Sequence, residues 1–318
     1  MCRCVIVTGA NGLVGSALIK KLLQNGVKVI GISRSFKNSV LPNQDNLIKL
    51  EIDASNEHEM LEKLPKFKYY AFYHLAWNGV NSKYRDDPNI QLANLNLAIS
   101  CCNVAKKLQC TRFLCAGTIA ERVVDSLHNL ATTSASMFYG VSKYCCHLLV
   151  ETYCKSINLE LVWMEIASVY GQNNNTGNVI NYTINQLLND KKACFGPGQQ
   201  FFDFIYVDDL VEAMYRLGFY EISSQYYFLG TNQPNKLFFF VKAIAKIMGK
   251  EDLVKFGIRE DDGIKFTKDM FDSSKLMADI GKYITVSFEE GISRTLQLIL
   301  KEMNVTVLLN QQSSLTSL

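Results

Sequence analysis

The chain has 318 residues, 48% of them hydrophobic, and its formal net charge is +3. This length and apolar content can bury a substantial core in one large or two modest domains. The small charge, with no run of Lys or Arg interleaved with aromatic residues, argues against nucleic-acid binding. Apolar runs all fall well short of the roughly 18 residues that a membrane-spanning helix needs, so we expect no membrane segment.

A strand pattern at the N-terminus leads directly into a glycine-rich turn. The apolar run from Val5 to Thr8 is followed by Gly9, Gly12 and Gly15, and an amphipathic helix begins there. Glycines let the backbone turn sharply and approach a pyrophosphate, whose charge the free N–H groups of a helix N-terminus stabilise. A second strand over 27–33 completes a β-α-β unit, which predicts a dinucleotide-binding site.

Ten cysteines raise the alternatives of a metal site or a disulfide framework. The adjacent or nearly adjacent cysteines at 2/4, 101/102 and 145/146 lack C-x-x-C spacing, and the others fall in apolar strand or helix patterns. We therefore expect small buried side chains in a reducing compartment, with no bound metal. The first strand begins by Cys4, which leaves no room for a signal peptide and predicts a cytoplasmic location.

The end of the second strand bears on the choice of cofactor. An acidic residue there would bind the ribose hydroxyls of NAD, but Ser33 occupies the position and Arg34 follows it. A guanidinium flanked by hydroxyl groups suits a 2′-phosphate, so we expect NADP(H) in preference to NAD(H). The alternative is a solvated surface arginine. A third strand is expected over 46–52, ending at Asp53.

Further strands are expected over 69–75 and 112–116, with a long helix over 90–108 between them. Strands alternating with helices predict a parallel sheet covered on both faces, with the active site at the carboxyl ends of the strands. His74 ends one strand and is a candidate general base, but we interpret it as structural. The candidates that follow the strands are expected at one edge: Gly9, Ser33, Asp53, Ala76 and Thr118.

Tyr139 and Lys143 begin the next helix, which is expected over 137–155. Their i, i+4 spacing places both side chains on one helical face. There Lys143 would favour the ionised phenol electrostatically and hold a nicotinamide ribose, while Tyr139 exchanges a proton with a substrate oxygen. Thr118 would hydrogen-bond that same oxygen. Because the nicotinamide carries the hydride, the protein itself needs to transfer only the proton.

Together these motifs resemble an extended short-chain dehydrogenase/reductase of the nucleotide-sugar epimerase/dehydratase family. The resemblance covers residue 3 to about 300 and includes further motifs at Val169-Tyr170-Gly171 and Tyr206-Val207-Asp208-Asp209. It implies an α/β fold: a Rossmann-type doubly wound parallel sheet with a smaller C-terminal substrate-binding lobe. The cofactor domain would comprise 1–170 and 203–232, the lobe 171–202 and 233–305, and a polar tail 306–318. Further elements are expected at 159–167, 179–190, 210–218, 238–248 and 288–299.

The resemblance also implies roles for particular residues. Asp53 would contact the adenine amino group, Asn94 would brace its helix against the active-site strand, and Asp208-Asp209 would cap the helix at 210. Ser168 and Asn178 would contact the sugar and diphosphate, although each is equally consistent with a cap or turn residue. The catalytic set is Thr118, Tyr139 and Lys143. The substrate contacts are Trp77, Thr118, Ser168, Asn178 and Val179. The cofactor contacts are Thr8, Gly9, Asn11, Gly12, Leu13, Val14, Gly15, Ser33, Arg34, Asp53, Ala54, Leu75, Ala76, Trp77, Asn94, Tyr139, Lys143, Ile166 and Ala167.

The residues that follow the active-site threonine indicate which reaction of the family to expect. Dehydratases of the family carry Thr-Asp-Glu there, whereas this chain reads Thr118-Ile119-Ala120, which argues against water elimination. Several segments look closest to the branch of CDP-abequose synthase-like 4-ketoreductases. The resemblance thus implies NADPH-dependent reduction of the 4-keto group of a nucleotide-linked deoxyhexose, in polysaccharide biosynthesis, by a homodimer paired through 90–108 and 138–155. The alternatives are an NAD-dependent epimerase and a catalytically silent dinucleotide sensor.

Three positions depart from the family pattern. Arg122 replaces a common Tyr, Glu165 replaces a common Arg, and Phe202 stands where an Arg often holds the diphosphate. Loss of that Arg removes a charge-assisted contact to the substrate phosphates, for which Lys191 or Lys192 is a conceivable substitute. Since Thr118, Tyr139 and Lys143 are intact, we still expect an active enzyme.

Overall fold

The structure is a computed structural model that describes residues 3–80, 82–126, 137–171, 177–260 and 266–315. Within these ranges, the side chains at 82–83, 125–126 and 302–315 are not described. None of the helices in the described ranges is both long and apolar enough to cross a membrane.

A parallel sheet of seven strands forms the centre of the molecule, in the order β11-β6-β5-β4-β1-β2-β3. The strand order reverses at β1, so a crevice is expected above its carboxyl end. This sheet confirms the predicted fold class, although sequence reasoning missed the edge strand β11. The strands are β1 Cys4–Thr8, β2 Lys28–Ser33, β3 Leu47–Glu51, β4 Tyr69–His74, β5 Arg112–Ala116, β6 Glu160–Ile166 and β11 Tyr226–Leu229.

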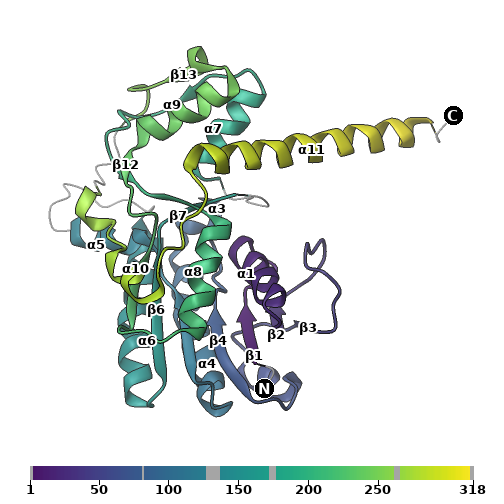
Figure 1. The fold of residues 1–318 in the computed structure, drawn as a ribbon, viewed down its shortest axis with the longest axis vertical. Helices are drawn as coiled ribbons and strands as arrows, with labels where there is room; N and C mark the ends of the chain where they lie inside the picture. The colour runs from purple at the N-terminus through teal and green to yellow at the C-terminus, as the bar shows by residue number, and fades with distance from the viewer. Residues whose placement is uncertain (1–2, 81, 127–136, 172–176, 261–265, 316–318) are drawn as a thin grey trace.

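Helices cover both faces of the sheet, as Figure 1 shows. Because strand side chains alternate, Val5 and Val7 of β1 join one apolar cluster while Cys4 and Ile6 join the other. The first cluster includes α1 Leu13–Gln24, α8 Val207–Phe219 and α10 Ser274–Ile280; the second includes α2 Glu57–Lys63, α4 Pro88–Lys107 and α6 Phe138–Ser156.

The cysteines are mostly core residues of the second cluster. None of the nine with described side chains forms a disulfide, and the Sγ atoms of Cys102 and Cys154 lie 3.8 Å apart between α4 and α6. Burial raises the pKa of Cys110 and Cys146 to about 12, so these thiols stay protonated. The expectation of burial was wrong for Cys145, which faces outward on α6 and is exposed, and Cys194 is only partly buried.

A smaller group of elements lies beyond the carboxyl edge of the sheet, at the top of Figure 1. Its apolar cluster is separate and rich in aromatic side chains. The elements are β7 Ser168–Tyr170, α7 Val179–Leu188, β8 Ala193–Cys194, β9 Phe201–Phe202, β10 Phe204–Tyr206, β12 Asn235–Lys236, α9 Leu237–Met248, η4 Glu251–Leu253, β13 Val254–Lys255 and α11 Phe288–Leu315. The remaining short helices of the described ranges are α3 Ser82–Arg85, η1 Ile119–Arg122, α5 Val123–Ser126 and η5 Lys268–Met270.

The division into two domains stays a prediction. Phe271, Leu276, Ile280 and Tyr283, assigned from sequence to the lobe, pack in the first cluster of the large sheet. The expected polar tail overlaps α11, whose side chains beyond 301 are not described.

The motif Asp208-Asp209 does not cap a helix, so that expectation was wrong. α8 begins at Val207, with Tyr206 as its N-cap, and both aspartates lie in its first turn. The Asp209 carboxylate instead accepts hydrogen bonds from Thr285 N at 3.1 Å and Val286 N at 3.0 Å. Because its donors come from a distant segment, Asp209 attaches the chain before α11 to the first turn of α8.

Candidate functional site

A cavity of about 700 Å³ runs along the carboxyl ends of the strands. The five strand-end candidates, Gly9, Ser33, Asp53, Ala76 and Thr118, all contribute to its wall. Of the expected cofactor contacts, the structure brings together there Gly9, Asn11, Gly12, Leu13, Val14, Gly15, Ser33, Arg34, Asp53, Ala54, Leu75, Ala76, Trp77, Tyr139, Lys143, Ile166 and Ala167.

The glycine turn has the geometry of a phosphate cradle. Gly9 has a φ of +70°, and a Cβ at Gly15 would overlap the Gly9 carbonyl. Gly12 is the N-cap of α1 and offers no side-chain hydrogen bond to the first turn. The free N–H groups at this helix N-terminus therefore face the cavity unblocked, which fits the pyrophosphate of a dinucleotide.

The loop after β2 forms another part of the wall of this cavity. Ser33 Oγ and Asn11 Nδ2 both donate to the Ser35 carbonyl at 3.1 Å, which holds the loop in place. Arg34 is exposed at the rim. Hydrogen bonds from Ser55 lower the pKa of Asp53, to which Arg34 adds a smaller effect. The wall of this cavity thus includes both a cation and a carboxylate.

Two expected cofactor contacts do not line the cavity. Thr8 is fully buried, and its Oγ1 lies 3.0 Å from His74 Nδ1. Asn94 is also fully buried: it donates to the Asn78 carbonyl at 3.0 Å and accepts from Asn78 N at 2.7 Å. Asn94 therefore braces α4 against the loop that follows β4, and not against a strand as expected.

His74 lies beneath the cavity as a neutral core residue. It is 2% exposed and stacks on Phe113 with ring centroids 6.0 Å apart. Burial, together with the positive charge of Lys143, lowers the pKa of His74 to about 3. A histidine so placed contributes packing and a hydrogen bond to Thr8, in line with the structural interpretation.

This lowered pKa predicts a loss of stability in acid. The unfolded chain protonates His74 below about pH 6.5, whereas the folded protein keeps it neutral to about pH 3. Stability from this site is therefore fully present above pH 6.5 and falls by about 1.4 kcal/mol per pH unit as the pH drops towards 3. Urea unfolding of His74→Asn should show a correspondingly smaller loss of stability. The matched change at the exposed His58 should keep the wild-type slope, and equal slopes in all three proteins would contradict the prediction.

The three expected catalytic residues meet at one place. Lys143 is 5% exposed and donates to the Ala116 carbonyl at 2.7 Å, which ties α6 to the end of β5. Its Nζ lies 3.8 Å from the centroid of the Trp77 ring, and the Tyr139 ring packs edge-on to the same indole at 6.2 Å. Trp77 thus holds the lysine and the tyrosine of the motif in fixed positions.

Thr118 is fixed by a capping box at the start of η1. Its Oγ1 accepts from Ala120 N at 3.3 Å, and its own N–H donates to Glu121 Oε1 at 2.7 Å. Since the hydroxyl oxygen is used as an acceptor in this contact, its proton can be donated to a group in the cavity.

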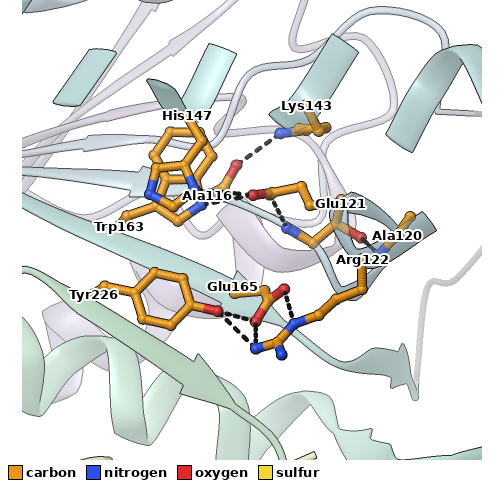
Figure 2. Close-up of polar contacts among 10 residues, drawn as sticks. Ala116, Ala120, Glu121, Arg122, Lys143, His147, Trp163, Glu165 and Tyr226 are labelled. Atoms are coloured by element: carbon orange, nitrogen blue, oxygen red, sulfur yellow. Dashed lines mark hydrogen bonds and ion pairs between the residues drawn. The ribbon is translucent and has the colours of Figure 1, made fainter. Parts of the chain in front are cut away.

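Glu121, which sequence reasoning did not single out, organises the layer behind Thr118 (Figure 2). It is 3% exposed, and its Oε2 lies 3.2 Å from both His147 Nδ1 and Trp163 Nε1. The His147 ring stacks on Trp163 with centroids 4.3 Å apart. A Cβ at Gly117 would overlap Trp163, so glycine is required there for the strand to approach this layer.

Two of the sequence departures form a single ion pair, also drawn in Figure 2. Arg122 binds both oxygens of Glu165, Nε to Oε1 at 2.9 Å and Nη2 to Oε2 at 2.8 Å, and donates to the Tyr226 hydroxyl at 2.9 Å. Tyr226 in turn donates to Glu165. Burial raises the pKa of Glu165, while the Arg122 hydrogen bonds oppose that shift. The charges of Arg122 and Glu165, the two unusual residues, therefore balance each other.

A second cavity, of about 560 Å³, meets the first at Thr118 and Tyr139, which line both. Asn178 lines it too, and its side chain caps α7 by accepting from Asn181 N at 2.9 Å. The other expected substrate contacts, Ser168 and Val179, also line this cavity, whereas Trp77 lines the first.

Sequence reasoning missed several residues of this second cavity. Arg85, Gln200 and Phe266 line it beside the noted Phe202, whereas Lys191 and Lys192 lie outside its described wall. Arg85 follows the loop after β4 and matches no motif, so only the assembled structure identifies it.

The sequence and the fold are similar to those of known proteins. A sequence model of the NAD dependent epimerase/dehydratase family matches residues 5–218. UDP-glucose 4-epimerase of Mycolicibacterium smegmatis is 23% identical over 92% of this chain and 97% of its own length. CDP-abequose synthase of Yersinia pseudotuberculosis is 22% identical over 66% of this chain and 71% of its own. The structure of UDP-glucose 4-epimerase from Thermotoga maritima superposes with a TM-score of 0.79 and 20% identity, covering 94% of this chain and 99% of that one.

Proposed function

Because the chain belongs to the NAD-dependent epimerase/dehydratase family, we propose that it reduces the 4-keto group of a nucleotide-linked deoxyhexose with NADPH. The observation that carries this proposal is the junction of the two cavities at Thr118 and Tyr139. A dinucleotide in the first cavity and a sugar in the second would meet at these two hydroxyl groups. Bound NADPH would supply the hydride.

The residues at the junction have separate tasks in this reaction. The hydroxyl groups of Thr118 and Tyr139 would orient the substrate carbonyl oxygen and stabilise the charge that develops on it. Tyr139 would then give its proton to that oxygen, as a general acid. The ammonium group of Lys143 would stabilise the phenolate that remains. Trp77 keeps this lysine beside the tyrosine, so no rearrangement of the pair is needed.

The absence of acids after Thr118 supports reduction over dehydration. Ile119 and Ala120 follow it, and neither side chain can transfer a proton. Glu121 is turned away, since both its oxygens face Thr118 N, His147 and Trp163. No carboxylate in the described wall of either cavity adjoins Tyr139 to assist water elimination.

The test is nicotinamide absorbance after mixing the protein with NADPH and CDP-, dTDP-, UDP- or GDP-linked 4-keto-6-deoxyhexoses. Oxidation of NADPH with one of them is the expected result and identifies the nucleotide. If no sugar supports oxidation, the proposal is wrong. Incubation with a 4-hydroxy nucleotide sugar such as UDP-glucose, followed by chromatographic analysis for a new isomer, would then separate an epimerase from a silent sensor.

An NAD-dependent epimerase is the second candidate. It needs the same Thr118, Tyr139 and Lys143, and the similarity to a UDP-glucose 4-epimerase over most of the chain favours it. An epimerase returns the hydride to the same sugar, so it would retain NAD through purification and consume no NADPH.

The preference for NADPH rests on Arg34, with Ser33 in place of an acidic residue at the strand end. We expect Arg34→Ala to weaken NADPH binding by about 1.5–3 kcal/mol, the range for a hydrogen bond to a charged group, and to leave NADH binding nearly unchanged. Fluorescence titration of both cofactors measures the difference. The same change at the distant Arg259 should affect neither cofactor, and an equal loss for NADPH and NADH at Arg34 would remove the NADP assignment.

The proposal includes a cytoplasmic homodimer paired through α4 and α6. Large apolar side chains are exposed on these two helices: Leu92, Phe138, Leu148 and Leu149. Such side chains are typical of a surface that a second subunit covers.

A further inference from the structure

The second cavity carries one charged side chain among its described lining residues, that of Arg85. The Cζ atom of Arg85 lies 4.1 Å from the centroid of the Tyr139 ring. This contact places the guanidinium beside the expected proton donor, at the wall where the two cavities meet.

Arg85 is partly buried, and one of its guanidinium nitrogens lacks a hydrogen bond to the described residues. Its Nε is buried and has no hydrogen-bond partner within the described part of the chain. None of the ion pairs found among the described residues includes it. A buried donor without a partner is costly, and the planar fork of N–H groups in arginine matches the oxygens of a phosphate or carboxylate.

The rest of the described lining of this cavity is uncharged. Phe202, Phe204 and Phe266 form an aromatic part of its wall, and Gln200 and Asn178 contribute neutral amides. A nucleotide sugar that enters must bring its negative charges into this space. Of the described lining groups, only Arg85 carries a positive charge that can pair with one of them.

We propose that Arg85 binds an oxyanion of the nucleotide sugar, either its diphosphate or a carboxylate on its sugar. This inference rests on the proposed function, because it requires a nucleotide sugar in the second cavity. A phosphate and a carboxylate each present two oxygens that the forked N–H groups of the guanidinium can bind. The contact with Tyr139 holds the guanidinium in place before the ligand arrives, which lowers the entropy lost on binding.

The test compares ligand affinities of the wild type, Arg85→Met and Arg85→Lys by isothermal titration calorimetry in the presence of NADPH. The probes are UDP, UDP-glucose, UDP-glucuronic acid and uridine, together with the CDP series of CDP, CDP-glucose and cytidine. Methionine keeps apolar packing on Tyr139 without charge, and lysine keeps the charge without the fork. Arg259→Met is the matched control, since Arg259 lies 4.7 Å above the Tyr182 ring and outside both cavities.

If Arg85 binds the diphosphate, Arg85→Met should weaken all diphosphate ligands by about 10–100-fold and leave the nucleoside unchanged. If it binds a carboxylate, only UDP-glucuronic acid should lose affinity. Arg85→Lys should recover part of the loss, and Arg259→Met should bind as the wild type does.

Two other outcomes are separable. If Arg85→Met binds every probe as tightly as the wild type does, the proposed role of Arg85 is wrong. The proposed function would then still stand. Failure of the wild type to bind any CDP-, dTDP-, UDP- or GDP-linked sugar would overturn both. An unchanged NADPH affinity and melting temperature would show that a weakened variant is still folded.

Discussion

Replacing Tyr139 with Phe should lower kcat by about 10²–10⁴-fold, the range for loss of a general acid. The phenol oxygen is the group that would give its proton to the reduced carbonyl, and phenylalanine keeps the ring that packs on Trp77 and beneath Arg85. Steady-state kinetics with the sugar identified by NADPH oxidation, together with titration of NADPH binding, check this expectation. NADPH affinity should change little, since most of the cofactor wall is intact.

Tyr215→Phe is the matched control for this loss. Tyr215 lies on α8, packs on Phe219 with ring centroids 5.0 Å apart, and lines neither cavity. This variant should retain wild-type kcat. Undiminished turnover in Tyr139→Phe would show that another group donates the proton. A wild type that binds NADPH but turns over no sugar would favour the silent sensor.

Removing Arg122 should cost about 3–5 kcal/mol in the free energy of unfolding, because it leaves the buried Glu165 carboxylate without its counter-ion. Glu165 is 2% exposed on β6, and among the described residues only Tyr226 would remain as its hydrogen-bond donor. Urea unfolding of Arg122→Met measures the loss. Because the pKa of Glu165 is already raised, protonation at low pH should relieve part of the cost.

A double-mutant cycle separates the ion pair from the packing around it. Arg122→Met combined with Glu165→Leu removes both charges, and such apolar replacements of buried pairs are often close to neutral. The double variant should therefore be more stable than Arg122→Met alone, with a coupling energy of about 0.5–3 kcal/mol. Additive losses would show that the two side chains do not stabilise each other, contrary to the geometry in Figure 2.

Local patterns in the sequence were sufficient to predict the fold and most of the residues that line the first cavity. Strand periodicity, the glycine spacing after β1 and the i, i+4 pair of Tyr139 and Lys143 are short-range features. Parallel β-α-β units bring the carboxyl ends of their strands to one edge, so candidates at those ends must meet. The expected bounds of the first six strands lie within one or two residues of the observed bounds, because strand periodicity is a local pattern.

Tertiary structure alone decided which distant side chains pair. Arg122 and Glu165 are 43 residues apart and looked like two unrelated departures, and Asp209 binds Thr285 across 76 residues although its position suggested a helix cap. Arg85 matches no motif, yet packing of the loop after β4 sets it over Tyr139. The physical reason is that periodicity determines which face of an element is buried. The partner of a polar side chain on that face depends on how separate elements pack together, which no local pattern encodes.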